Sequence, residues 1–181
     1  MPTCVSHVRL NMLKADLHPL RWLFFFITTS LLVTADQFSK AWIRTYPEGS
    51  VIFQKGFLRI VHIENSGAAF GMLQGFSSAL MVFDFFALAG ILVYLLYFRQ
   101  RYPFPGFRTS WVAFTLIFTG TLGNLMDRLN SSVNGITDFL YLGPWPAFNV
   151  ADSCISIGVV LLVFSLLFIK EKQPTTNREQ V

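Results

Sequence analysis

The sequence predicts an all-α membrane protein with four transmembrane helices and a small extracytoplasmic β-sheet element in the loop after the first helix. Two observations predict this class. Hydrophobic residues make up 53% and charged residues 13% of the 181 residues, which is too apolar for an ordinary soluble domain. Apolar stretches long enough to cross a bilayer, which takes about 20 residues, lie at 21–43, 77–98, 109–127 and 150–169.

The segments between and around these stretches are polar. Residues 1–20 and 170–181 are expected to be tails on either side of a single domain at residues 21–169. After the first stretch, β-branched and aromatic residues at 51–53 and 57–63 flank Gln54-Lys55-Gly56, a pattern typical of a hairpin. We therefore expect the β-sheet element in this loop.

The positions of the basic residues predict the orientation of the helices. Cytoplasmic loops of membrane proteins are enriched in lysine and arginine. Such residues precede the first stretch, join the second to the third and follow the fourth: Arg9, Lys14, Arg21; Arg99, Arg101, Arg108; and Lys170, Lys172, Arg178. Both tails are therefore expected in the cytoplasm. The net charge of +4 is scattered over helix ends, a pattern that does not predict nucleic-acid binding.

Every predicted helix carries an aspartate, and a carboxylate inside a bilayer is costly enough to indicate a function. The four are Asp36, Asp84, Asp127 and Asp152. Because neighbouring helices run antiparallel, all four lie toward the outer side, where Asp138 of the last loop joins them. For Asp84 we expect a structural polar contact rather than a role with substrate.

Polar residues also recur at helical spacing, so that they share one face of each helix. The sets are Asp36, Ser39 and Lys40; Gly120, Gly123, Asn124 and Asp127; and Asn149, Asp152, Ser153 and Ser156. Polar faces at one membrane depth are expected to turn inward around a common cleft. This pattern fits a network that only packs helices. It also fits two aspartates that share a proton and activate water against a peptide bond.

Other chemistries have less support in the sequence. The histidines and cysteines are dispersed and no H-E-x-x-H occurs, so neither a metal nor a cofactor is expected. Ser39 and Lys40 are adjacent and point roughly 100° apart on a helix, which argues against a Ser-Lys dyad. A small proton-coupled carrier stays as the alternative, although a carrier needs a site near the midplane rather than on one side. A non-catalytic assembly factor would tolerate Asp→Asn changes.

Five motifs follow one another in order over residues 30–165. They are Asp36-Gln37-Phe38-Ser39-Lys40, Asn65-Ser66-Gly67-Ala68-Ala69-Phe70-Gly71, Gly123-Asn124-Leu125-Met126-Asp127-Arg128, Gly135-Ile136-Thr137-Asp138-Phe139 and Phe148-Asn149-Val150-Ala151-Asp152-Ser153. Together with the four apolar stretches, these motifs resemble those of the lipoprotein signal peptidases, the signal peptidase II family.

The resemblance implies an intramembrane aspartyl endopeptidase of the bacterial inner membrane, with its active site toward the outer face. It implies cleavage of diacylglyceryl-modified prolipoproteins before the lipidated cysteine, contact with membrane lipids, and inhibition by globomycin-type cyclic peptides. Asp138 and Asp152 match the family's catalytic aspartates. Supporting positions are Asp36, Lys40, Asn65, Gly67, Asn124, Asp127, Arg128 and Asn149. For Arg128 we expect an ion pair with Asp36 or Asp127.

Overall fold

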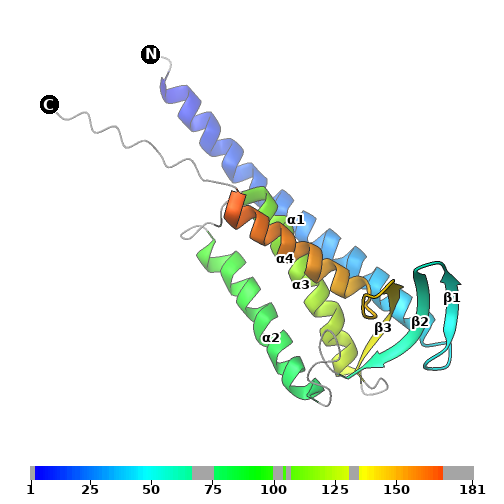
Figure 1. Cartoon of the computed structure of the whole chain (residues 1–181). Coiled ribbons are helices and arrows are strands. Elements are labelled where there is room, and N and C mark those ends of the chain that lie inside the picture. The colour runs from blue at the N-terminus through cyan, green and yellow to red at the C-terminus, as the bar shows by residue number, and fades with distance from the viewer. Residues whose placement is uncertain (1–2, 67–75, 100–103, 105–106, 131–134, 169–181) are drawn as a thin grey trace.

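Four helices and three short strands make up the computed structural model, which describes residues 3–66, 76–99, 104, 107–130 and 135–168 (Figure 1). The helices are α1 (Thr3–Ile43), α2 (Ser77–Val93), α3 (Phe107–Leu129) and α4 (Val150–Phe168). A short π-helix, η2 (Tyr94–Phe98), continues α2. The strands are β1 (Val51–Lys55), β2 (Leu58–Asn65) and β3 (Ile136–Leu142).

Each predicted apolar stretch corresponds to a helix. Two helical segments, Ser77–Phe98 and Val150–Phe168, are long and apolar enough to cross a membrane among the described residues. Their outer faces carry exposed side chains such as Phe83, Phe86 and Val160. The first helix differs from the prediction, because it begins at Thr3 and includes Pro19, where a polar tail was expected.

The helix α3 packs against the other three helices. Aromatic and aliphatic side chains from α1, α2, η2 and α3 form one buried cluster: Phe25, Leu88, Leu95, Trp111, Phe118 and Leu125. The contact of α3 with α4 is closer, because glycines lie where a Cβ would collide with the neighbouring helix. A Cβ on Gly123 would lie 3.1 Å from the Ala151 Cβ, and one on Gly158 would lie 2.9 Å from the Ala113 carbonyl oxygen. Small residues commonly permit such close helix packing in bilayers.

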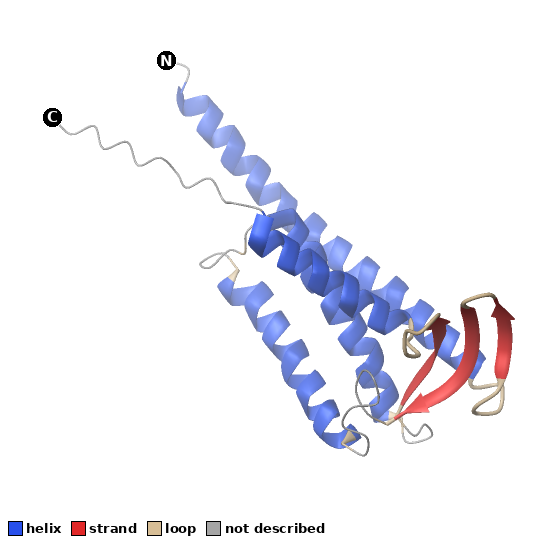
Figure 2. Ribbon diagram, in the orientation of Figure 1, coloured by secondary structure: helices blue, strands red, loops and turns tan. Residues whose placement is uncertain are grey.

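The strands form one antiparallel sheet in the order β1-β2-β3. Figure 2 shows the sheet at one end of the helices, near the end of α1 and the start of α4. The predicted hairpin is confirmed as β1 and β2, joined at Gly56, whose φ is 59°. Strand β3 was not predicted from the sequence, because this short run pairs with β2 from a distant part of the chain.

Pairing between β2 and β3 positions two polar residues from separate motifs. Asn65 pairs with Ile136, and Ile63 pairs with Asp138, so the end of β2 lies beside the start of β3. After β3 the chain folds back, and Phe148 and Leu140 exchange backbone hydrogen bonds of 3.0 and 2.8 Å. Asn149 and the start of α4 are thereby held next to Asp138.

Candidate active site

Two carboxyl groups from different elements meet where β3 and α4 adjoin. Asp138 lies on β3, and Asp152 lies in the first turn of α4. Asn149 joins them: its side-chain Nδ2 donates to Asp138 Oδ1 at 2.8 Å, and its backbone N–H donates to Asp152 Oδ2 at 3.2 Å. Each carboxyl also has a donor of its own. Asn65 Nδ2 donates to Asp138 Oδ2 at 3.0 Å, and Asn124 Nδ2 donates to Asp152 Oδ1 at 2.8 Å.

The sequence Asn149-Val150-Ala151-Asp152 forms its own helix start. Asn149 occupies the N-cap position, and its Oδ1 accepts the backbone N–H of Asp152 at 2.9 Å. Because Asp152 accepts the Asn149 N–H in return, the two residues form a reciprocal cap of the capping-box type. This bonding satisfies two backbone donors that would otherwise have no partner at the end of a buried helix. It also fixes the orientation of both side chains.

A fully buried lysine on α1 supports this arrangement. The Nζ of Lys40 lies 2.8 Å from Asp36 Oδ2, 2.9 Å from Asp127 Oδ2 and 3.1 Å from Asn124 Oδ1. An ammonium group has three protons, and each finds one of these acceptors. Because Lys40 bonds to the amide oxygen of Asn124, the amide nitrogen of Asn124 is directed toward Asp152.

Asp127 is held as a paired carboxylate. Besides Lys40, its oxygens accept from Arg44 Nη2 at 2.8 Å, from Gln37 Nε2 at 3.2 Å and from the backbone N–H of Thr137 at 3.3 Å. The Nε of Arg44 also donates a hydrogen bond to Thr137 Oγ1 at 2.7 Å. Arg44 was not among the predicted site residues, although it lies one helical turn after Lys40, just past the end of α1, and so on the same side.

Asp36 has a different set of contacts. Its Oδ2 is bound by Lys40, while its Oδ1 accepts the backbone N–H of Ala151 at 2.9 Å. The carboxylate therefore sits at the N-terminus of α4, where the helix dipole favours a negative charge. Asp36 and Asp127 are balanced by the buried Lys40 and the half-buried Arg44, so these four charges sum to zero. The balance explains how ionised groups persist in a buried position.

The Asp138–Asp152 pair is not balanced in this way. Burial of its carboxyl, and next the charge of Asp152, raise the pKa of Asp138 to about 7, against the opposing effects of Asn65, Asn149 and Lys40. Two carboxyls so close do not readily ionise together, which leaves one proton for the pair near neutral pH. The pair can act as an acid and a base at once. Among the described residues, no group of three His, Cys, Asp or Glu side chains is placed to hold a metal ion.

Comparison with known proteins agrees with these features. The family model described as signal peptidase (SPase) II matches residues 28–168. The chain belongs to the signal peptidase II family. A lipoprotein signal peptidase of Dehalococcoides mccartyi is 40% identical over 151 residues, covering 82% of this chain and 91% of the relative. One from Thermodesulfovibrio yellowstonii is 37% identical over 147 residues, covering 78% and 92%.

Solved structures resemble this signal peptidase II in fold as well. A bacterial membrane enzyme solved by the in meso method at 2.3 Å resolution superimposes with a TM-score of 0.71 and 29% identity. The match covers 83% of this chain and 94% of that enzyme. A second bacterial membrane enzyme, solved at 1.9 Å, gives a TM-score of 0.68 at 29% identity and covers 80% and 93%.

Most site residues predicted from the sequence come together in one network. The set consists of Asp36, Lys40, Asn65, Asn124, Asp127, Asp138, Asn149 and Asp152. Gly67 lies outside the described residues. Ser39 and Ser153 bond to backbone carbonyls one turn earlier on their own helices, at 2.8 and 3.0 Å.

The predicted ion pair of Arg128 with Asp36 or Asp127 was wrong. Arg128 pairs with Asp84 of α2, and not with Asp36 or Asp127. Successive helical side chains point roughly 100° apart. Asp127 therefore faces α1 while Arg128 faces α2. Asp84 accordingly has the structural polar contact expected of it, and the ion pair ties α2 to α3.

Proposed function

We propose that this protein is an aspartyl endopeptidase that removes the signal peptide from diacylglyceryl-modified prolipoproteins by cleaving before the lipidated cysteine. One observation carries the proposal. Asp138 and Asp152 lie side by side and share Asn149 as a common donor, whereas Asp36 and Asp127 are neutralised by Lys40 and Arg44. We therefore assign the proton exchange of the reaction to the first pair.

We assign the base to Asp152 and the acid to Asp138. Asp152 lies in the first turn of α4, where the helix dipole favours the carboxylate. Asp138, with its raised pKa, holds the shared proton near neutral pH. Asp152 takes a proton from water as the water oxygen bonds to the scissile carbonyl carbon, and Asp138 gives its proton to the carbonyl oxygen. When the C–N bond breaks, Asp152 returns its proton to the leaving amine, and Asp138 recovers one from the hydroxyl.

We also propose that all four helices span the bacterial cytoplasmic membrane, with both tails in the cytoplasm and the active site toward the outer face. The distribution of basic residues supports this orientation. Five aspartates lie in the half of the bundle that carries the sheet: Asp36, Asp84, Asp127, Asp138 and Asp152. This one-sided placement disfavours a proton-coupled carrier, which needs a site open to both faces. Membrane lipids are then neighbours of both enzyme and substrate.

The deciding experiment measures single-turnover cleavage of a diacylglyceryl-modified prolipoprotein by the purified protein. Asp138→Asn and Asp152→Asn are each expected to slow cleavage by about 10²- to 10⁴-fold, the usual contribution of a positioned acid or base. The control is Glu48→Gln, which changes an exposed carboxylate in the turn before β1. Full activity in Asp138→Asn would refute the assignment.

Three further conditions test the substrate and the chemistry. Cleavage is expected to continue in the presence of a chelator, because the mechanism uses no metal. It is expected to fail with the unlipidated prolipoprotein and to be inhibited by a globomycin-type cyclic peptide. Equal turnover of the lipidated and unlipidated forms would refute the proposed substrate while leaving the aspartyl mechanism intact.

A further inference from the structure

A second polar feature lies at the opposite end of the helices from the sheet. An open groove runs between α1 and α3, and its described lining consists of basic and apolar side chains: Leu20, Arg21, Phe24, Arg108, Trp111 and Val112. Leu20 and Phe24 are exposed on the α1 side, at 58% and 42%. Two arginines therefore flank a strip of apolar surface that faces outward from the bundle.

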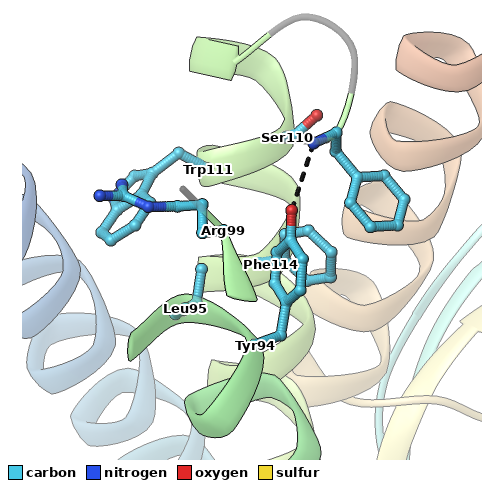
Figure 3. Close-up of a pocket in the computed structure, with 7 residues that line it drawn as sticks. Tyr94, Leu95, Arg99, Ser110, Trp111 and Phe114 are labelled. Atoms are coloured by element: carbon cyan, nitrogen blue, oxygen red, sulfur yellow. Dashed lines mark hydrogen bonds between the residues drawn. The ribbon is translucent and has the colours of Figure 1, made fainter. Parts of the chain in front are cut away.

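Trp111 is the rigid wall of this groove. It is buried, its Nε1 donates to the Arg21 carbonyl oxygen at 3.3 Å, and its ring packs edge-on against Trp22 at 5.4 Å. On another side, the Arg99 guanidinium lies against the Trp111 ring (Figure 3). Its Cζ is 4.6 Å from the ring centre. The tryptophan thus fixes the positions of the α1 and α3 walls and holds a third arginine beside them.

Three guanidinium groups from three elements converge here. Arg21 comes from α1, Arg99 follows η2 and Arg108 lies in the first turn of α3. Arg21 interacts electrostatically with both Arg99 and Arg108. Arginines that serve only to orient a membrane protein can extend separately toward water. Here Arg99 is buried and Arg21 is half-buried, so the positive charges are held near one another.

We propose that this groove binds an anionic phospholipid of the cytoplasmic leaflet. Its phosphate lies between Arg21 and Arg108, and an acyl chain follows Leu20, Phe24 and Val112. Planar guanidinium groups suit phosphate oxygens, because they donate paired hydrogen bonds. Basic pockets between helices on the cytoplasmic side are a known setting for anionic headgroups. The leaflet follows from the proposed orientation, whereas the lipid chemistry follows from the groove itself.

A lipid in this position contacts α1 and α3 at once. It therefore stabilises their contact at the end of the bundle away from Asp138 and Asp152, and is separate from the substrate. Binding is expected to raise the thermal stability of the protein without changing the chemistry of cleavage. Failure of this inference leaves the proposed peptidase unaffected, because the two sites share no residue.

The test titrates dioleoylphosphatidylglycerol, and separately dioleoylphosphatidylcholine, into the purified full chain in neutral detergent. Melting temperature and native mass spectrometry report binding. We expect the anionic lipid alone to raise the melting temperature and to remain bound. Arg21→Gln and Arg108→Gln are each expected to weaken the affinity for the anionic lipid roughly five-fold, since a basic residue near anionic lipid contributes about 1 kcal/mol. The rise in melting temperature at a given lipid concentration is then smaller. Arg108 is exposed, so its variant is expected to fold.

The matched control is Lys55→Gln, which removes an exposed positive charge from β1 at the other end and is expected to keep the full response. Glycerol 3-phosphate supplies the phosphate without acyl chains and is expected to give no shift. A shift with glycerol 3-phosphate would identify a phosphate site instead of a lipid site. Equal responses to both lipids, or an unchanged response in both arginine variants, would overturn the proposal. So would a shift from dimer to monomer in those variants, which would place a second copy in the groove.

Discussion

Asn149 is the residue on which the geometry of the two aspartates depends. Its side-chain amide contacts Asp138 through Nδ2 and the backbone N–H of Asp152 through Oδ1, and its own N–H contacts the Asp152 carboxyl. One residue therefore starts a helix and holds the proposed acid and base at fixed positions. Side chains fixed in this way need little rearrangement when a substrate arrives, which favours catalysis.

The raised pKa of Asp138 predicts the pH dependence of cleavage. The acid is protonated below about pH 7 and loses its proton above it. We therefore expect kcat/KM to fall as pH rises through 7, about ten-fold per pH unit once the acid is mostly ionised. Stopped or gel-based assays between pH 5.5 and 9 measure this limb. A rate that is flat from pH 6 to pH 9 would contradict the assigned acid.

The same shift predicts an effect on stability. Since the folded-state pKa of Asp138 lies above that of an unfolded aspartate, the native protein binds the proton more tightly between about pH 4 and pH 7. Stability is therefore lost as pH rises through that window. Asp138→Asn lacks the titrating group, so its melting temperature is expected to fall less between pH 5 and pH 8 than that of the wild type. Identical falls in the two proteins would contradict this prediction.

Asp127 is expected to matter for folding more than for chemistry. Its buried carboxylate pairs with the buried Lys40 and the half-buried Arg44. Removing one partner of a buried ion pair destabilises by roughly 3–5 kcal/mol. Asp127→Asn should therefore lower the melting temperature by several degrees and keep some turnover in the folded fraction. Asp152→Asn is expected to show the opposite result: little change in melting temperature, and cleavage slowed by about 10²- to 10⁴-fold.

For individual residues, motifs and helical spacing were enough to predict which side chains assemble. They were not enough to predict the hydrogen-bond and ion-pair partners of each side chain. Asp36, Lys40, Asn124 and Asp127 met as expected because their spacing fixes a shared face. The partner of Arg128 depended on how far α3 is rotated toward α2, a property of the packed bundle. For Arg44, the four-residue spacing from Lys40 could be seen in the sequence. Its ion pair with Asp127 became visible only in the structure.

Strand β3 is the element that carries Asp138 to the site. Its first residues are buried between the sheet and the helices, while its pairing with β2 sets Asn65 beside Asp138. The sequence predicted the β1–β2 hairpin, because a hairpin is encoded by neighbouring residues. It did not predict β3, because that strand is stabilised by a partner more than 70 positions away. Local patterns carry no information about such pairing.

Gly135, just before β3, provides the next prediction. Its φ is 121°, a conformation that side chains rarely adopt, and a Cβ there would collide with the carbonyl oxygen of Asn65. Gly135→Ala should therefore push Asn65 away from Asp138, and so lower both cleavage and melting temperature. Gly143→Ala is the control: its φ is 58° and a Cβ there meets nothing within 4 Å, so only the conformational term remains, about 1 kcal/mol. Equal losses in the two variants would show that the contact with Asn65 is unimportant.

Over the whole molecule, the helices differ in how much of their length is apolar. α2 and α4 present apolar outer faces, whereas α1 and α3 contribute Asp36, Lys40, Asn124 and Asp127 to the buried network. This difference explains why, among the described residues, two helical segments are apolar enough by composition to cross a membrane. By length α3 also reaches about 35 Å, at 1.5 Å per residue, against a hydrocarbon layer of about 30 Å. Pairing inside the bundle makes its charges compatible with a bilayer.

The four-span arrangement makes a prediction about access from each side of the membrane. Glu48 lies in an exposed turn beside the sheet, which the arrangement places outside. A Glu48→Cys variant should react in intact cells with a thiol reagent that cannot cross membranes. The native Cys4 is the internal control, since the N-terminal tail is expected in the cytoplasm and should react only after permeabilisation. Cys154 is buried within α4 and adds little background.

Reporter fusions after Tyr46 and after Arg101 give an independent measurement of the topology, and the two reporters are expected on opposite sides of the membrane. Labelling of Cys4 in intact cells, or both reporters on one side, would refute four spans with cytoplasmic tails.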